Sequence, residues 1–96
     1  MDKITIHRNV CDSVHDLYER KNSDYGDSFA ITRERIPNAI LVRLWDKLLR
    51  LETLMLNGSQ KVQDESIEDT MFDLANYCLM ELTERIADRQ KMQSKK

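Results

Sequence analysis

The sequence predicts an all-α protein, a compact bundle of three main helices plus a short connecting helix that assembles as a homo-oligomer. The chain of 96 residues holds one proline and two glycines, so few residues interrupt a helix. No segment alternates apolar and polar residues over the length of a strand. Hydrophobic residues make up 41% and charged residues 33%, which is the balance of a globular chain rather than a disordered one.

The length fits one domain, because a hydrophobic core rarely divides in a chain this short. We expect this domain to cover residues 1–90. Residues 91–96 should form a frayed polar tail, since they offer no apolar side chains at helical spacing.

The first helix is predicted to begin after Thr5 and to end near Asn22. Apolar residues recur along it at helical spacing, namely Ile6, Val10, Val14 and Leu17. Cys11 widens this stripe, and Cys78 lies on the stripe of the last helix. We expect both thiols to be buried as small hydrophobes, with a reactive thiol as the alternative. His7 is expected in the core or in an interface, with a ligand or a base as the alternative.

A short second helix should follow. Asp27 or Ser28 can cap its start, because short oxygen-bearing side chains accept hydrogen bonds from free backbone amides, and it should reach about Arg35. Ile36 precedes a proline and is therefore expected to leave the helical region. Pro37 suits the first turn of the next helix.

The helix expected over residues 37–56 is apolar around well over half of its circumference. A chain this small buries only a modest core, so part of this surface should meet another copy, with Trp45, Leu41 and Leu49 in or near the interface. Gly58 can end this helix in the left-handed conformation. The last helix should start at Asp64 or Ser66, where Ser66 and Asp69 approximate a capping box, and end near Arg89.

Charge and hydropathy exclude some partners. The formal net charge is −2, whereas binding to duplex nucleic acid needs a basic footprint. No apolar run is long enough to span a membrane, and the N-terminus lacks the apolar centre of a signal peptide. We therefore expect a cytoplasmic protein, in the host cytoplasm if a phage encodes it.

Charged and polar side chains recur at helical spacing on the two long C-terminal helices. The basic series is Arg43, Lys47 and Arg50. The other series is Asp69, Asp73 and Asn76, and with Glu65 and Glu68 its acidic members form a carboxylate cluster. In one interpretation the two series form ion pairs across the bundle. In the other, the carboxylates hold Mg²⁺ and the cations hold phosphates, because Mg²⁺ prefers oxygen ligands and guanidinium groups suit phosphate oxygens.

The stretch K-N-S-D-Y-G-D-S-F between the first two helices is a candidate wall of a nucleotide site. Lys21 continues the apolar stripe and so should point inward. Tyr25 offers a ring for stacking on a base, and Gly26 permits close approach of a ligand. Asp24 or Asp27 can orient a ribose hydroxyl or a Mg²⁺ ion. The alternative is an ordinary turn that reverses the chain.

Three stretches occur in the order R-K-N-S-D-Y-G-D-S-F, R-L-W-D-K-L-L-R-L and E-S-I-E-D-T-M-F-D-L-A-N-Y-C-L-M. Together, over about Glu19 to Met80, they resemble the phage-associated nucleotide modification associated domain family. The resemblance implies a role in nucleotide metabolism of phages or prophages. The chain is more distantly similar to MazG-like all-α nucleotide pyrophosphohydrolases, which form helical oligomers and bind Mg²⁺ through carboxylates on two facing helices.

Only one of those two acidic clusters is present, because Arg43, Lys47 and Arg50 occupy the helix that should carry the other. A basic helix facing an acidic one suits a phosphate-bearing ligand better than a two-metal reaction. We therefore expect a phage protein that binds a nucleotide between helices and sequesters it without turnover, for example a host immune signal. Asn76 belongs to the same expected site. The alternatives are a Mg²⁺-dependent MazG-like nucleoside triphosphate pyrophosphohydrolase and a non-catalytic structural or regulatory helical oligomer.

Overall fold

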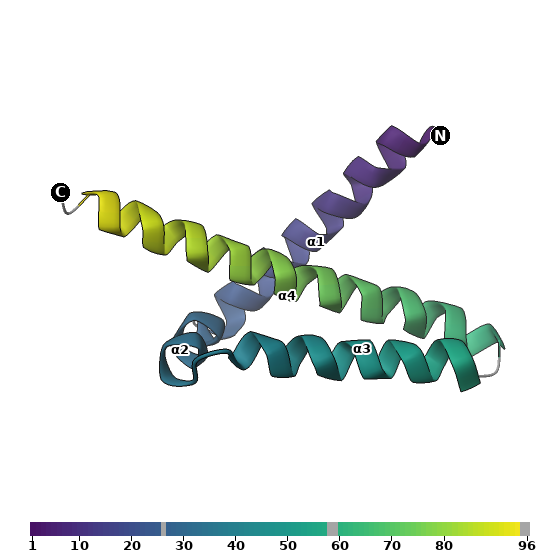
Figure 1. Ribbon diagram of the computed structural model, residues 1–96. Coiled ribbons are helices and arrows are strands. Elements are labelled where there is room, and N and C mark those ends of the chain that lie inside the picture. The colour runs from purple at the N-terminus through teal and green to yellow at the C-terminus, as the bar shows by residue number, and fades with distance from the viewer. Residues whose placement is uncertain (26, 58–59, 95–96) are drawn as a thin grey trace.

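The computed structural model describes residues 1–25, 27–57 and 60–94, with the side chains of residues 24, 25 and 60–64 left aside. Within these residues the chain forms four helices and no strand: α1 (Lys3–Tyr25), α2 (Ser28–Arg35), α3 (Ala39–Asn57) and α4 (Gln60–Ser94). The predicted all-α bundle of three long helices and one short one is confirmed (Figure 1).

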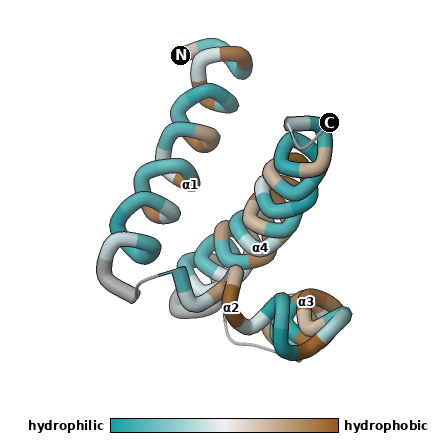
Figure 2. Tube along the Cα trace, turned by 90° about the vertical axis from the view of Figure 1, so that its left-hand side faces the viewer, coloured by the Kyte–Doolittle hydropathy of each residue, from teal (hydrophilic) through white to brown (hydrophobic). Residues whose placement is uncertain are grey.

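Helix α4 is the centre of the arrangement. It packs antiparallel along α3, and α1 crosses it on the other side, so that α4 lies between them (Figures 1 and 2). Helix α2 bridges the end of α1 and the start of α3. Among the described residues the buried apolar side chains are Val14 of α1 and Phe29 of α2, so the core of the single chain is small.

Helix α1 is longer than predicted at both ends. It begins at Lys3 because Asp2 caps it: the Thr5 amide donates a hydrogen bond of 2.8 Å to Asp2 Oδ1. This backbone hydrogen bond lowers the pKa of Asp2. At the other end the helix runs on to Tyr25, so most of the stretch predicted as a loop is helical.

The starts of the other helices also differ from the prediction. Asp27 occupies the N-cap position of α2, but its φ is 60° and its side chain makes no capping hydrogen bond. Ile36 is extended, as expected before a proline. Pro37 does not open α3, because Asn38 adopts a left-handed φ of 65° and the helix begins only at Ala39. The predicted Gly58 cap lies outside the described residues.

Helix α4 begins at Gln60, several residues before the predicted start. The predicted capping box of Ser66 and Asp69 is therefore wrong, because both residues lie inside the helix. The Ser66 carbonyl instead accepts a hydrogen bond of 2.7 Å from the Thr70 hydroxyl. The helix continues to Ser94 and so passes the predicted end near Arg89. No helix in the described part of the chain is long and apolar enough to cross a membrane.

The apolar stripe of α1 is buried only where α4 lies against it. Val14 is buried, but Ile6 and Val10 are exposed because the N-terminal half of α1 extends beyond the other helices (Figure 2). Both cysteines are exposed, so the prediction of buried thiols is wrong for the single chain. His7 is likewise exposed and not in the core, with its Nδ1 atom 3.8 Å from Cys11 Sγ.

The wide apolar surface predicted for α3 is confirmed. No residue of this helix is buried within the chain, and the Trp45 side chain is 66% exposed. The helix therefore uses only part of its apolar surface to pack against α4.

Candidate functional site

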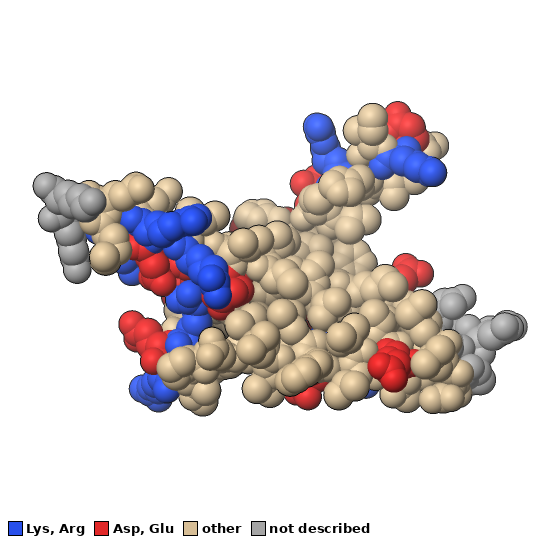
Figure 3. Space-filling view, in the orientation of Figure 1, with Lys and Arg blue, Asp and Glu red and all other residues tan. Residues whose placement is uncertain are grey.

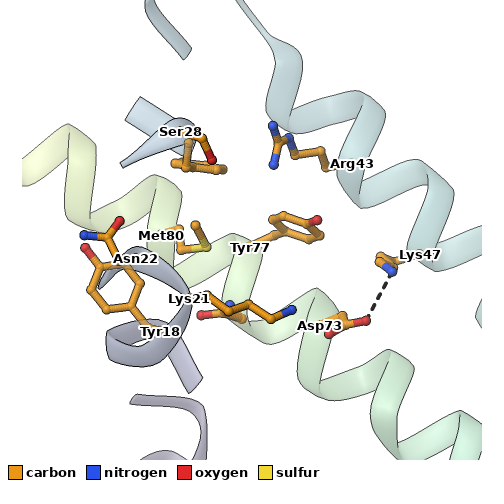
Figure 4. Close-up of a pocket in the computed structure, with 11 residues that line it drawn as sticks. Tyr18, Lys21, Asn22, Ser28, Arg43, Lys47, Asp73, Tyr77 and Met80 are labelled. Atoms are coloured by element: carbon orange, nitrogen blue, oxygen red, sulfur yellow. Dashed lines mark ion pairs between the residues drawn. The ribbon is translucent and has the colours of Figure 1, made fainter. Parts of the chain in front are cut away.

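All four helices contribute to a polar cavity of about 250 Å³ at the place where α1 crosses α4. Its lining residues are Tyr18, Lys21 and Asn22 from α1, Ser28 and Phe29 from α2, Arg43 and Lys47 from α3, and Asp73, Asn76, Tyr77 and Met80 from α4. Figure 4 shows the basic side chains of α3 on one side of this cavity and Tyr18, Asn22 and Met80 on the other.

Arg43 is held in this cavity by two aromatic rings. Its Cζ atom lies 5.3 Å from the ring centroid of Phe29 and 5.5 Å from that of Tyr77. The rings themselves are stacked, with centroids 6.4 Å apart. A cation at this distance is attracted by the negative faces of the rings. Among the described residues no carboxylate pairs with Arg43, so its N–H groups are available to an anion.

Two lysines flank this arginine. Lys47 Nζ forms an ion pair of 3.1 Å with Asp73 Oδ2 across the α3–α4 contact. Lys21 comes from α1, and its extended side chain reaches into the space between Tyr77 and Asp73 (Figure 4). Three cationic side chains and one carboxylate among the lining residues give a formal charge of +2 (3 − 1). The cavity therefore favours an anionic ligand, although the whole chain is acidic.

Asn76 adds an unsatisfied polar group to the lining. Its side chain is 7% exposed, and its buried Oδ1 atom has no hydrogen-bond partner among the described residues. An unpaired buried amide is costly, by about 1–3 kcal/mol, and such groups deserve a functional explanation. A ligand with a hydrogen-bond donor at this position would satisfy Asn76.

Helix α2 is fixed over the cavity by ion pairs to α4. Arg33 donates two hydrogen bonds to Glu81, of 3.0 Å from Nε and 3.1 Å from Nη2, and one of 2.9 Å to Asp88. Arg85 also donates to Glu81, at 2.7 Å. The hydrogen bonds from Arg33 are the main reason that the pKa of Glu81 lies below its usual value. We call this group of four residues the Arg33 clasp.

Asp27 directly precedes Ser28 of the cavity lining, but does not itself line the cavity. Burial raises the pKa of Glu84 on α4, and the Asp27 carboxylate is the second cause of this rise. The two carboxylates therefore repel each other, and Asp27 is exposed and does not line the cavity. The contribution of Asp27 to the binding wall therefore stays a prediction.

The structure brings together part of the predicted site. Lys21, Arg43, Lys47 and Asn76 line one cavity, as does Asp73 of the predicted carboxylate cluster. Arg50 is exposed and does not reach it. The side chains of Asp24 and Tyr25, and the whole of Gly26, lie outside the described residues, so their place in the site stays a prediction.

The carboxylates predicted for Mg²⁺ do not form a metal site in the described part of the chain. Glu65, Glu68 and Asp69 are exposed, and none of them lines the cavity. No group of three or more potential metal ligands occurs among the described residues. Asp73, the remaining member, is paired with Lys47. This donor set does not fit a magnesium ion, which is usually held by carboxylates together with substrate phosphates.

Sequence reasoning missed the aromatic and small polar side chains of the cavity. Tyr18 precedes Lys21 by three residues and so shares its face of α1, a spacing that could have indicated it. Tyr77 follows Asp73 by four residues and carried the same signal. Asn22, Ser28 and Phe29 lie within the stretch predicted as a wall of the site, although none of them was singled out. Met80 is brought to the cavity by the helix crossing, which no local pattern reveals.

The fold and the cavity define a small all-α protein with a basic, aromatic-lined site between its helices. The chain belongs to the nucleotide modification associated domain 1 family, whose sequence model matches residues 21–84. The resemblance to the nucleotide modification associated domain family is thus confirmed. The match includes every residue that lines the cavity except Tyr18. No curated protein and no solved structure matches the chain.

Proposed function

We propose that this protein binds a nucleotide in the cavity and holds its phosphate groups with Lys21, Arg43 and Lys47. The observation that carries the proposal is the state of Arg43. Two stacked rings fix the guanidinium in place, and no described carboxylate neutralises it. A guanidinium fixed in this way is suited to bidentate hydrogen bonds with phosphate oxygens.

The other side of the cavity suits the base and the sugar. Tyr18 offers an aromatic face, and base–aromatic stacking contributes about 1–3 kcal/mol. Asn22 and Asn76 carry amides that can donate to and accept from the edges of a base or a ribose hydroxyl. The volume of about 250 Å³ is slightly below the range of about 300–1,000 Å³ that is typical of small-molecule sites. The site therefore favours one small ligand over a polymer.

Binding without turnover is the activity that we propose. A two-metal hydrolysis needs several carboxylates at the phosphate groups, whereas the described cavity offers Asp73 alone, paired with Lys47. We propose further that this is a phage protein of the host cytoplasm, and that as an oligomer of identical chains it withdraws a nucleotide signal of host immunity. This last step rests on the family resemblance and on analogy with small sequestering proteins.

Native mass spectrometry of the purified protein, with identification of released small molecules, is the first test. Isothermal titration with that ligand, or otherwise with the four ribonucleoside triphosphates and pyrophosphate, then compares two arginine variants. Arg43→Ala should weaken binding by about 1.5–3 kcal/mol, the strength of a hydrogen bond to a charged group. Arg50→Ala is the matched control, because Arg50 lies on the same helix but outside the cavity. Equal affinities of the two variants, or no binding by the wild type, would refute the proposal.

A further inference from the structure

The single chain has a larger surface than a monomer of its mass should have. Its accessible surface is 8046 Å² for a mass of 11.4 kDa. Monomeric proteins of this mass expose about 5,800 Å², so the excess is about 2,200 Å². The radius of gyration is 16.0 Å, whereas a domain of this length has about 12.5 Å. Both measures indicate that part of the surface is covered in the native protein.

A candidate for the covered surface is an apolar face formed by α3 and α4. A shallow depression of about 330 Å³ lies between them. It is lined by Leu41, Leu44, Trp45, Leu48, Leu74 and Cys78, which we call the Trp45 face. Figure 3 shows a broad surface without charged side chains over the middle of α3 and α4, with the charged groups toward its edges.

We infer that a second copy of this chain covers the Trp45 face. The excess of about 2,200 Å² per chain exceeds the roughly 800 Å² per partner of a standard interface and falls in the obligate class. The described core holds only Val14 and Phe29 as buried apolar residues. The chain therefore needs this interface in order to be stable, and its own copies are the partner always present when it folds. A two-fold arrangement places the same face on both chains, which suits a surface without charge.

The Trp45 face and the cavity have no lining residue in common among the described residues. Arg43 and Lys47 lie on a different side of α3 from Leu41, Trp45 and Leu48, because residues four apart share a face while those one or two apart do not. On α4, Cys78 directly follows the cavity residue Tyr77 and so points to a different side, whereas Leu74, three residues before Tyr77, lies at the border between the two surfaces. The inference thus does not depend on nucleotide binding, and its test uses no ligand.

Sedimentation velocity at micromolar concentration provides the test. The wild type should sediment as two chains or an even multiple. Trp45→Glu should sediment as a single chain or lose its helical circular dichroism, since a charge would be buried at the centre of the interface. Val10→Glu is the matched control: it makes the same change at an exposed apolar residue on the projecting part of α1 and should leave the assembly intact. A monomeric wild type, or dissociation by Val10→Glu but not by Trp45→Glu, would overturn the inference.

The two cysteines give a second measurement that needs no variant. Both are exposed in the single chain, but only Cys78 lies in the Trp45 face. In the native protein, alkylation followed by intact mass spectrometry and peptide mapping should modify Cys78 at least tenfold more slowly than Cys11. In urea the two rates should become similar. Equal rates in the native protein would refute a covered Trp45 face even if Trp45→Glu fails to fold.

Discussion

Replacing Arg33 by alanine removes the three hydrogen bonds that hold α2 against α4, and we expect it to lower the thermal stability strongly. The Arg33 side chain is 25% exposed and that of Glu81 is 12% exposed, so the pair is largely shielded from water. Hydrogen bonds to charged groups contribute about 1.5–3 kcal/mol in such surroundings. The bond to Asp88 adds little, because that side chain is 55% exposed.

The expected loss of unfolding free energy is smaller than the sum of the contributions of these hydrogen bonds. Arg85 remains as a partner of Glu81 in the variant, so the carboxylate is not left unpaired. We therefore expect Arg33→Ala to lower the free energy of unfolding by about 2–3 kcal/mol, equivalent to roughly 10–20 °C in Tm for a domain of this size. Circular dichroism at one fixed protein concentration measures this, since assembly makes Tm depend on concentration.

Arg85→Ala is the matched control for this experiment. Arg85 also donates to Glu81, but its side chain is 64% exposed and it pairs within one helix, four residues apart. Such pairs contribute about 0.3–0.5 kcal/mol, so Tm should fall by no more than about 4 °C. If Arg33→Ala and Arg85→Ala had the same Tm, the Arg33 clasp would not be what holds α2 in place.

The pH dependence of stability tests the same ion pair. Arg33 lowers the pKa of Glu81 below the ordinary value of 4.5, so the ionised carboxylate is favoured in the folded chain. This stability is fully present above the ordinary pKa and is lost as the pH falls through the lowered one. The difference in Tm between the wild type and Arg33→Ala should therefore narrow over the acidic range below 4.5, the ordinary pKa of Glu81. A gap that stays constant over this range would refute the role of the Glu81 charge.

Three further variants test the surroundings of the cavity. Glu84→Gln should raise Tm slightly near neutral pH, because burial and, second, the Asp27 carboxylate raise the pKa of Glu84 and disfavour its charge in the folded chain. The gain in Tm should be smaller below about pH 4, where Glu84 is neutral in both states. An unchanged Tm near neutral pH would contradict this. Asp73→Asn should tighten phosphate-ligand binding about two- to fivefold in calorimetry, as it frees Lys47 from an ion pair of about 0.5–1 kcal/mol, whereas a metal-dependent reaction would lose activity. Tyr18→Ala should weaken nucleotide binding by about 1–3 kcal/mol. Tyr25→Ala, titrated in the same way, tests the stacking residue predicted from the sequence. The comparison shows which of the two rings stacks on the base.

The helices could be predicted from the sequence because few residues interrupt them and their apolar stripes recur at helical spacing. Their ends were less predictable. Asp2 caps α1 ahead of the first residue of its apolar stripe, so the stripe does not indicate where the helix begins. Asn38 takes a left-handed conformation, which Pro37 alone does not predict, and α3 therefore begins only after it. Which residues of α1 are buried also depends on how much of this helix lies against α4. Ile6 and Val10 lie beyond that contact and are therefore exposed.

The cations of the cavity were predictable for a related reason. Arg43 and Lys47 share one face of α3, and Asp73 and Asn76 share one face of α4, so spacing alone groups each pair. Spacing also suggested Arg50, which is one turn too far along α3 to line the cavity. The contact of Phe29 with Arg43 could not be found in this way, because Phe29 reaches Tyr77 and Arg43 only through the packing of α2 on α4.

That packing connects the stability of the fold to the proposed site. Among the residues of α2, Phe29 is the buried apolar one, so hydrophobic burial gives this short helix little support. Its position depends on Arg33, whose partners Glu81 and Asp88 are 48 and 55 residues away in the sequence. Arg33 fixes α2, α2 carries Phe29, and Phe29 together with Tyr77 holds the Arg43 guanidinium. A charged contact outside the cavity therefore determines the geometry of the charged group inside it, and no pattern within either helix contains that information.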